Sequence, residues 1–181
     1  ISLHERNTRR IMNEKRRLLG MTLDELKGVA FEAGLPGYAA KQMADWLYKK
    51  KVTSIAAMTN IASAKRALLE KNFEVGAVPP SDLMKSVDGT IKYLYPAGPG
   101  NFVESVYIPT EDRATLCVSS QVGCKMNCLF CMTGKQGFTK NLSANEILNQ
   151  IQSLPETEEL TNIVFMGMGE PLDNVDELFK V

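Results

Sequence analysis

Three cysteines within eight residues constrain this chain more than any other feature. Cys124, Cys128 and Cys131 form a C-x3-C-x2-C motif, and Cys117 lies seven residues upstream of it. Thiolates on so short a loop can all reach the irons of one 4Fe–4S cluster, which has four irons to ligate. The motif therefore predicts a cluster held by Cys124, Cys128 and Cys131, with one iron left open to a small molecule.

Other uses of cysteine fit this spacing less well. A structural zinc site usually pairs two C-x2-C knuckles a dozen or more residues apart, or includes histidine. Here all four cysteines fall between 117 and 131, and the only histidine is His4. A disulfide framework is typical of much shorter secreted chains. A buried, inert cluster of cysteines would not need the polar Lys125 and Asn127 between its members.

The composition predicts a soluble chain with two unlike halves. The 181 residues are 44% hydrophobic and 23% charged, and no apolar stretch is long enough to cross a membrane. We expect a cytoplasmic protein that binds no membrane. Residues 1–80 hold 14 Lys and Arg against 8 Asp and Glu, a charge of +6, and residues 81–181 hold 7 against 13, a charge of −6. The two halves are therefore expected to face different partners.

The first half is predicted to be a small all-helical domain over residues 1–78, similar to a helix-hairpin-helix unit. Thr22-Leu23-Asp24-Glu25 is a capping box that begins a helix. A second helix follows Pro36-Gly37, and a third spans roughly 64–73. The sequence Val78-Pro79-Pro80-Ser81 is typical of a linker.

Basic residues cluster at two places in this helical half. Phosphate backbones attract such clusters, chiefly through the release of counterions, so the clusters are candidates for a surface that docks RNA. From charge alone, a solvated helix face is the favoured interpretation. The clusters consist of Arg6, Arg9, Arg10, Lys15, Arg16 and Arg17, and of Lys49, Lys50 and Lys51.

Beyond the linker, residues 79–181 are predicted to form strands with period two. The pair Asp88-Gly89 is typical of a tight hairpin. In the middle strand Phe102, Glu104, Val106 and Ile108 share one face. A carboxylate in that apolar row must be paired, neutral or facing a ligand cavity, unless the strand lies at an edge open to water. The strands are expected near 91–95, 102–108 and 113–118.

A βαβ unit is predicted after the cysteines. Ser143-Ala144-Asn145-Glu146 is a second capping box, and Thr161 to Met166 is a run typical of a buried strand. That run ends in Gly167-Met168-Gly169-Glu170-Pro171, here named the glycine segment. Ligands of βαβ units sit at the carboxyl ends of the strands. We expect the glycines to let the backbone approach a ligand closely and Glu170 to hold a cationic group.

These motifs together resemble those of the radical S-adenosylmethionine (SAM) enzymes, and within them the RlmN family of adenine-C2 RNA methyltransferases. The resemblance implies an α/β fold: part of a (βα)6 barrel with a β-hairpin extension, in residues 79–181. Six βα units need far more chain than the roughly two found here, so we expect the natural protein to continue. The segments that carry the resemblance are Val103 to Pro109, Arg113 to Cys124 and Gly167 to Leu172.

The resemblance also implies roles for seven residues. Glu104 matches the family's proton acceptor, and Cys117 matches the cysteine that resolves a covalent intermediate. Gly169 and Glu170 match the SAM-binding segment. The ligands of the 4Fe–4S cluster are matched by Cys124, Cys128 and Cys131.

The implied activity is methylation of C2 of an adenosine in 23S rRNA and tRNA through a methylated cysteine. That cysteine lies downstream of residue 181 in the family. A flavodoxin-type or other low-potential donor is expected to supply electrons, and the complete protein is expected to be a monomer. Two alternatives stay open: the sister family that methylates C8 of adenosine, and a non-catalytic iron–sulfur or zinc module.

Overall fold

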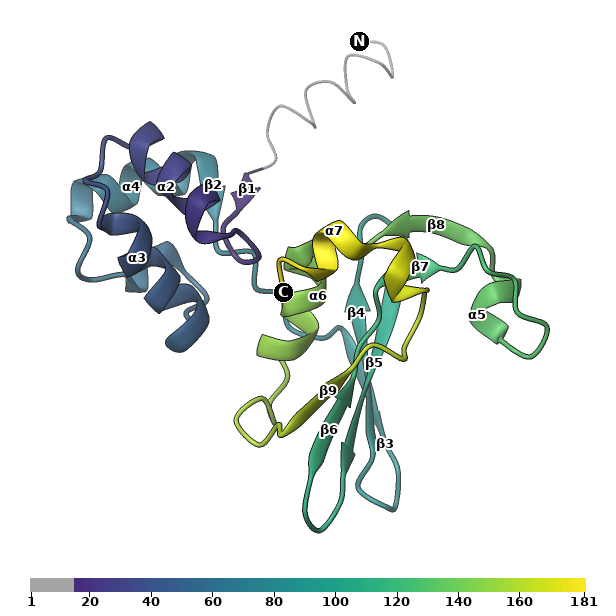
Figure 1. Cartoon of the computed structure of the whole chain (residues 1–181). Coiled ribbons are helices and arrows are strands. Elements are labelled where there is room, and N and C mark those ends of the chain that lie inside the picture. The colour runs from purple at the N-terminus through teal and green to yellow at the C-terminus, as the bar shows by residue number, and fades with distance from the viewer. Residues whose placement is uncertain (1–14) are drawn as a thin grey trace. The chain divides into compact units, whose positions relative to one another are not determined.

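The computed structural model describes residues 15–181, and the chain divides into two compact units, Ile1–Gly76 and Ala77–Val181 (Figure 1). The division lies two residues before the domain boundary expected after residue 78. The basic residues Arg6, Arg9 and Arg10 lie outside the described residues. Over residues 15–181, no helix combines the length and the apolar character needed to cross a membrane.

The three helices expected in the first unit are present. At the start of the first, the Thr22 hydroxyl accepts from the Glu25 N–H, and the Glu25 carboxylate accepts from the Thr22 N–H at 2.7 Å. This is the predicted capping box. Leu26, Val29 and Ala30 then face the interior of the unit. The helical elements are α2 (Leu23–Glu32), α3 (Ala39–Ala44), a π-helical turn η1 (Asp45–Lys49), a 3-10 turn η2 (Ile55–Ala57) and α4 (Ser63–Asn72).

The prediction that this unit is all-helical is wrong in one respect. Strand β1 (Arg16–Arg17) pairs in parallel with β2 (Phe73–Glu74). Arg16 forms an ion pair with Glu32 at 3.0 Å and lies over the ring of Phe73, 4.5 Å from its centroid. Arg17 forms an ion pair with Glu74 at 3.2 Å. Carboxylates within the unit therefore partly neutralise the charge of both arginines, and the basic surface here is weaker than the sequence predicts.

The second unit is built on a five-stranded sheet with the order β3-β4-β5-β6-β9. Neighbours from β3 to β6 are antiparallel, and β6 pairs with β9 in parallel. The hairpin at Asp88-Gly89 and the three predicted strands that follow it are confirmed. The strands are β3 (Asp82–Lys85), β4 (Ile91–Pro96), β5 (Phe102–Pro109), β6 (Ala114–Cys117) and β9 (Asn162–Val164).

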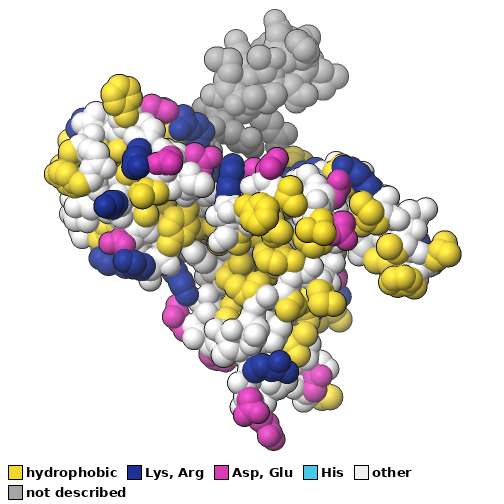
Figure 2. Space-filling view, in the orientation of Figure 1, with side chains coloured by type: hydrophobic (Ala, Val, Ile, Leu, Met, Phe, Trp, Pro, Cys, Tyr) yellow, Lys and Arg dark blue, Asp and Glu magenta, His cyan; other side chains and the backbone are white. Residues whose placement is uncertain are grey.

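Helix α6 (Ala144–Gln152) packs on one face of this sheet, and the hydrophobic core of the unit lies between them. Its Ile147 is buried in one cluster with Tyr93, Val103 and Leu116 from the strands. The predicted capping box at Ser143 is present. The run from Thr161 to Met166, which contains β9, was expected to be buried, and this is wrong: Ile163 is 42% exposed. Within residues 15–181, β9 has a strand on one side alone, and Figure 2 shows hydrophobic side chains gathered at the surface of this unit.

A smaller two-stranded sheet flanks the segment that holds Cys124, Cys128 and Cys131, and it was not predicted. It pairs β7 (Gln121–Gly123) with β8 (Phe138–Asn141), and α5 (Met132–Lys135) lies between them. After β9 come a 3-10 turn η3 (Pro171–Asp173) and α7 (Val175–Leu178). The described chain thus makes two strand-to-helix steps, from β6 to α6 and from β9 to α7, and it closes no barrel within residues 15–181.

Candidate functional site

The two predicted catalytic residues lie on the same face of the sheet. Strands β5 and β6 are adjacent, and Val106 is the direct partner of Cys117. Paired residues point to the same side, as do residues two apart on one strand, so Glu104 shares the face of Cys117. This is the face opposite the α6 core, because the alternate residues Val103 and Tyr107 are the buried ones.

Glu104 has a cationic partner. The Lys92 ammonium lies 3.0 Å from the Glu104 carboxylate, and the side chains are 43% and 44% exposed. Strand β5 lies between β4 and β6, so the edge-strand alternative is wrong. The carboxylate is paired and also faces a groove of about 110 Å³. The groove is lined by Asp82, Leu83, Met84, Lys92, Leu94 and Glu104.

Cys117 is a half-buried free thiol at the carboxyl end of β6. Burial raises the pKa of this thiol, and the Met166 N–H that donates to its sulfur partly opposes the shift. The protonated thiol is therefore favoured at neutral pH. A reaction that uses Cys117 as a nucleophile would have to remove this proton.

Buried polar side chains hold the strand ends next to this face. Ser119 is fully buried, and its hydroxyl donates to the Glu104 carbonyl at 2.6 Å and accepts from the Met168 N–H at 2.9 Å. The side-chain amide of buried Gln150 bonds both the N–H and the carbonyl of Ser119, at 2.9 and 3.0 Å. Ser119 thus connects the strand of the candidate base, the glycine segment and helix α6.

Gln121 holds the other end of the glycine segment. Its side-chain oxygen accepts from the Glu170 N–H at 2.9 Å. Gly169 has a φ of +97°, and a Cβ on it would lie 2.5 Å from the Cβ of Gln121. The glycine is therefore required by close contact inside the protein, in addition to any ligand. We call Ser119, Gln121, Gln150 and the glycine segment the strand-end cluster.

The Glu170 side chain lies at the start of η3. Its carboxylate accepts from the Leu172 N–H at 3.0 Å, which fixes one oxygen as the cap of the turn. Glu170 remains partly exposed. A carboxylate has acceptor capacity for several hydrogen bonds, so Glu170 can still bind an ammonium group.

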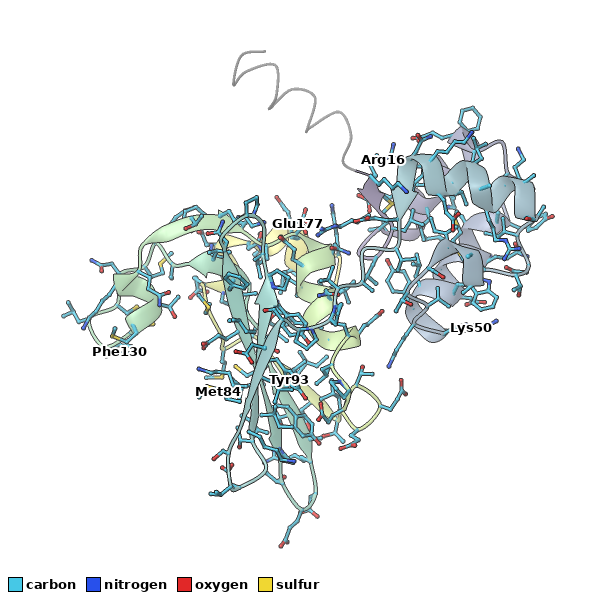
Figure 3. All side chains as sticks on the ribbon, turned by 180° about the vertical axis from the view of Figure 1, so that it is seen from behind. Arg16, Lys50, Met84, Tyr93, Phe130 and Glu177 are labelled. Atoms are coloured by element: carbon cyan, nitrogen blue, oxygen red, sulfur yellow. The ribbon has the colours of Figure 1, made fainter. Side chains whose placement is uncertain are left out.

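The predicted cluster ligands lie on one loop, residues 124–131, here named the cysteine loop. Cys128 is exposed, and Cys124 and Cys131 are half-buried. Within the described part of the chain, no three His, Cys, Asp or Glu side chains are gathered so that they could hold a metal ion. The loop also exposes 92% of Phe130, which Figure 3 shows at the outer end of this unit.

The chemistry of this donor set nevertheless suits an iron–sulfur cluster, because three thiols lie within eight residues. The Gly134 N–H donates to the Cys131 sulfur and lowers its pKa, which favours the thiolate that a metal requires. The neighbouring Lys125 connects the loop to η3, the turn that follows Glu170, with its ammonium 3.0 Å from Asp173. Lys125, and then Gln121, hold the pKa of Asp173 below its usual value.

The sequence analysis missed Ser119, Gln121, Lys92 and Asp173. Their roles depend on which strands and turns become neighbours, and a single polar residue in a short segment gives little signal of that. Lys92 is the exception, because the predicted hairpin and strands already place β4 beside β5. Opposite charges on the same face of two predicted neighbours would have indicated the pair.

Two family models match this chain, and so do solved structures. The model of the Radical SAM superfamily matches residues 118–181, and the model of the ribosomal RNA large subunit methyltransferase N-terminal domain matches residues 16–75. A crystal structure of a radical SAM methyltransferase from Sphaerobacter thermophilus matches with a TM-score of 0.82 and 36% identity, over 91% of this chain and 50% of that one. The class defined by the fold and the cysteine motif is therefore that of the radical SAM proteins.

Curated relatives identify the family within this class. One from Parabacteroides distasonis, named "Probable dual-specificity RNA methyltransferase RlmN", is 82% identical over 170 residues, 94% of this chain and 50% of the relative. The "Dual-specificity RNA methyltransferase RlmN" of Geobacter sulfurreducens is 46% identical over 161 residues, 89% of this chain and 45% of the relative. The chain spans about half the length of these relatives. It belongs to the RlmN family.

Proposed function

We propose that the full-length protein is a radical SAM RNA methyltransferase that methylates C2 of an adenosine in 23S rRNA and tRNA. The observation that carries the proposal is the placement of Glu104 and Cys117 on one open face of the sheet, on adjacent strands. The hydroxyl of Ser119 ties this face directly to the glycine segment. The names of the relatives support RNA as the substrate.

The target atom explains why such a site is needed. C2 of adenine lies between two ring nitrogens and is electron-poor, so it does not attack a methyl cation equivalent. When bound, SAM and the cluster supply one-electron chemistry at carbon, which avoids this difficulty. Cys124, Cys128 and Cys131 would ligate the cluster, and Gly169 and Glu170 would hold the SAM amino acid moiety.

Glu104 and Cys117 would then complete the reaction. Glu104 accepts the C2 proton once the new carbon–carbon bond has formed, and the Lys92 ammonium orients the carboxylate for this role. Cys117, as the thiolate, attacks the sulfur of the methyl-carrying cysteine downstream of residue 181. A sulfur–sulfur bond forms as the carbon–sulfur bond breaks, and the bonding electrons stay on the methylene carbon, which takes up a proton to become the methyl group of the released base. The unpaired electron left by the radical addition would pass to the cluster, as a one-electron acceptor, before this step.

The helical unit is proposed to dock the RNA. Among the described cations, Lys49 pairs with Asp45 at 2.8 Å, and Lys50 lies over the ring of Trp46 at 3.5 Å. Both side chains are held at the surface, where a phosphate backbone could reach them. We further propose that a flavodoxin-type protein donates electrons, that the complete protein is a monomer and that it is located in the cytoplasm.

The test combines cluster spectroscopy with product analysis on the anaerobically reconstituted full-length protein. Electron paramagnetic resonance of the reduced protein should give a four-iron signal that shifts when SAM is added. Incubation with 23S rRNA fragments and tRNA should yield 2-methyladenosine by mass spectrometry. A product methylated at C8 would support the sister family, and zinc without iron would support a non-catalytic module.

Two variants separate the proposed roles. Cys117→Ala should keep the cluster and accumulate a covalent protein–RNA adduct, because the step that releases the RNA is lost. Cys128→Ala should lose the cluster and form no adduct. Unchanged turnover of Cys117→Ala would contradict the resolving role of Cys117.

A further inference from the structure

Gln121 occupies a central place among the groups that the proposed function assigns to SAM. It is fully buried in β7, two residues before the strand ends and three before Cys124. Both the oxygen and the nitrogen of its side-chain amide form hydrogen bonds. The oxygen accepts from the Glu170 N–H at 2.9 Å, and the nitrogen donates to Asp173 at 2.8 Å and to Asn141 at 2.9 Å. One side chain thus contacts both ends of the turn that begins at Glu170.

The contacts of Gln121 continue to the cysteine loop. The Asp173 oxygen that accepts from Gln121 also lies 3.0 Å from the Lys125 ammonium. Lys125 directly follows Cys124, and its ammonium lies 4.3 Å from the centroid of the Phe138 ring on β8. A continuous path of polar contacts therefore runs from the cysteine loop through Lys125, Asp173 and Gln121 to the backbone of Glu170.

We infer that Gln121 is a positioning residue that sets the glycine segment and the cysteine loop at the mutual distance that SAM binding requires. The inference rests on the proposed function, in which the loop carries the cluster and Gly169 and Glu170 hold SAM. A ligand that bridges two segments binds tightly only when both are held in register, so loss of the outer contacts weakens binding even when the direct ligands remain.

The amide of Gln121 is specifically suited to this task. It faces a backbone donor, the Glu170 N–H, on one side and a carboxylate acceptor, Asp173, on the other. A glutamate in its place keeps the acceptor and replaces the donor by an oxygen that faces Asp173. Two carboxylate oxygens at hydrogen-bond distance repel each other, so the turn must move.

The experiment compares Gln121→Glu with the wild type in the reconstituted full-length protein at pH 8. We expect unchanged iron and sulfide content and a SAM dissociation constant raised about 10- to 100-fold, the range typical of lost supporting contacts around a ligand site. In the cluster-free protein, amide hydrogen exchange of residues 170–173 should be faster than in the wild type, which reports the position of the turn without SAM.

A rescue variant separates positioning from a general folding defect. Gln121→Glu combined with Asp173→Asn removes the repulsion between two carboxylates, because an amide again faces a carboxylate, but it also removes the ion pair between Asp173 and Lys125. This double variant should bind SAM more tightly than Gln121→Glu and more weakly than the wild type, because the contact between residues 121 and 173 is restored while the ion pair with Lys125 is not. The matched control is Asn149→Asp, another buried amide on this unit, whose side chain bonds the backbone of Val78. It should lower stability and leave SAM affinity unchanged.

The outcomes distinguish this inference from the proposed function. If the wild type binds SAM and Gln121→Glu binds it equally well, the inference is overturned and the proposed function stands. If Asn149→Asp weakens SAM binding as much as Gln121→Glu does, the effect is one of buried charge, and the inference is again overturned. If adding SAM does not shift the four-iron resonance signal of the wild type, the proposed function fails, whatever the amide hydrogen exchange rates of residues 170–173.

Discussion

The strand-end cluster and the cysteine loop serve one proposed site, yet they are built in opposite ways. Ser119, Gln121 and Gln150 are fully buried, and each makes at least two hydrogen bonds to other segments. In the cysteine loop, Leu129 and Phe130 are 90% and 92% exposed. The protein's own contacts therefore fix one half of the site, while the other half has few contacts that fix it.

This difference follows from what the proposed function assigns to each half. The glycine segment would present backbone and one carboxylate to a small molecule, so its shape can be set in advance by ordinary hydrogen bonds. The cysteine loop would present thiols to a metal cluster, whose bonds are strong enough to order a loop by themselves. We therefore expect substitutions in the strand-end cluster to affect folding, and substitutions in the cysteine loop to affect binding of the iron–sulfur cluster.

The largest effect is expected for Gly169→Ala. The φ of +97° strains any side chain, and the new Cβ would lie 2.5 Å from the Cβ and 2.8 Å from the N of Gln121. We expect the free energy of unfolding to fall by about 3 kcal/mol or more. Urea denaturation of the cluster-free full-length protein measures it.

Gly137→Ala is the control for backbone strain alone. Its φ is +78°, and a Cβ there would meet nothing within 4 Å. It should cost about 1 kcal/mol. Equal costs for the two variants would show that the glycine segment is not tightly packed on β7 and would break the comparison.

A smaller effect is expected for Ser119→Ala. The substitution removes the hydroxyl that joins the Glu104 carbonyl to the Met168 N–H, and leaves both groups without this partner. Loss of a buried hydrogen bond of this kind costs about 1–3 kcal/mol. The same denaturation experiment provides the measurement.

The neighbouring Ser120 gives a matched control. Its hydroxyl is equally buried and has no hydrogen-bond partner among residues 15–181. Ser120→Ala should therefore be neutral or slightly stabilising, because a buried polar group without a partner contributes nothing to stability. If both serine variants lose the same stability, the bridging role of Ser119 is wrong.

Local signals explain what the sequence could predict. Both capping boxes lie within four residues of chain, and the alternation in β5 correctly grouped Glu104 with Phe102, Val106 and Ile108 on one face, which the structure shows to be opposite the core. The pairing of β1 with β2 joins residues more than fifty positions apart and carries no local signal. Gln121 was missed for the same reason, since its partners Glu170 and Asp173 become neighbours only after β9 pairs with β6.

The smallest expected effect concerns the reactivity of two thiols, one from each side of the comparison. Cys117 lies beside the strand-end cluster, and burial raises its pKa, while the Gly134 N–H lowers the pKa of Cys131. The thiolate is the form that reacts with iodoacetamide. At pH 7 the cluster-free protein should therefore be alkylated about tenfold faster at Cys131 than at Cys117, as measured by peptide mass spectrometry.

The pH dependence of the two rates sharpens this prediction. A raised pKa means that the thiolate of Cys117 appears only above the usual cysteine range, so its rate should still be climbing at pH 9. The lowered pKa of Cys131 means that its rate should level off at a lower pH. In 8 M urea both environments are lost and the two rates should converge. Equal rates in the folded protein would mean that Cys117 is as open to solvent as the cysteine loop, and the two halves of the site would not differ in the way their contacts indicate.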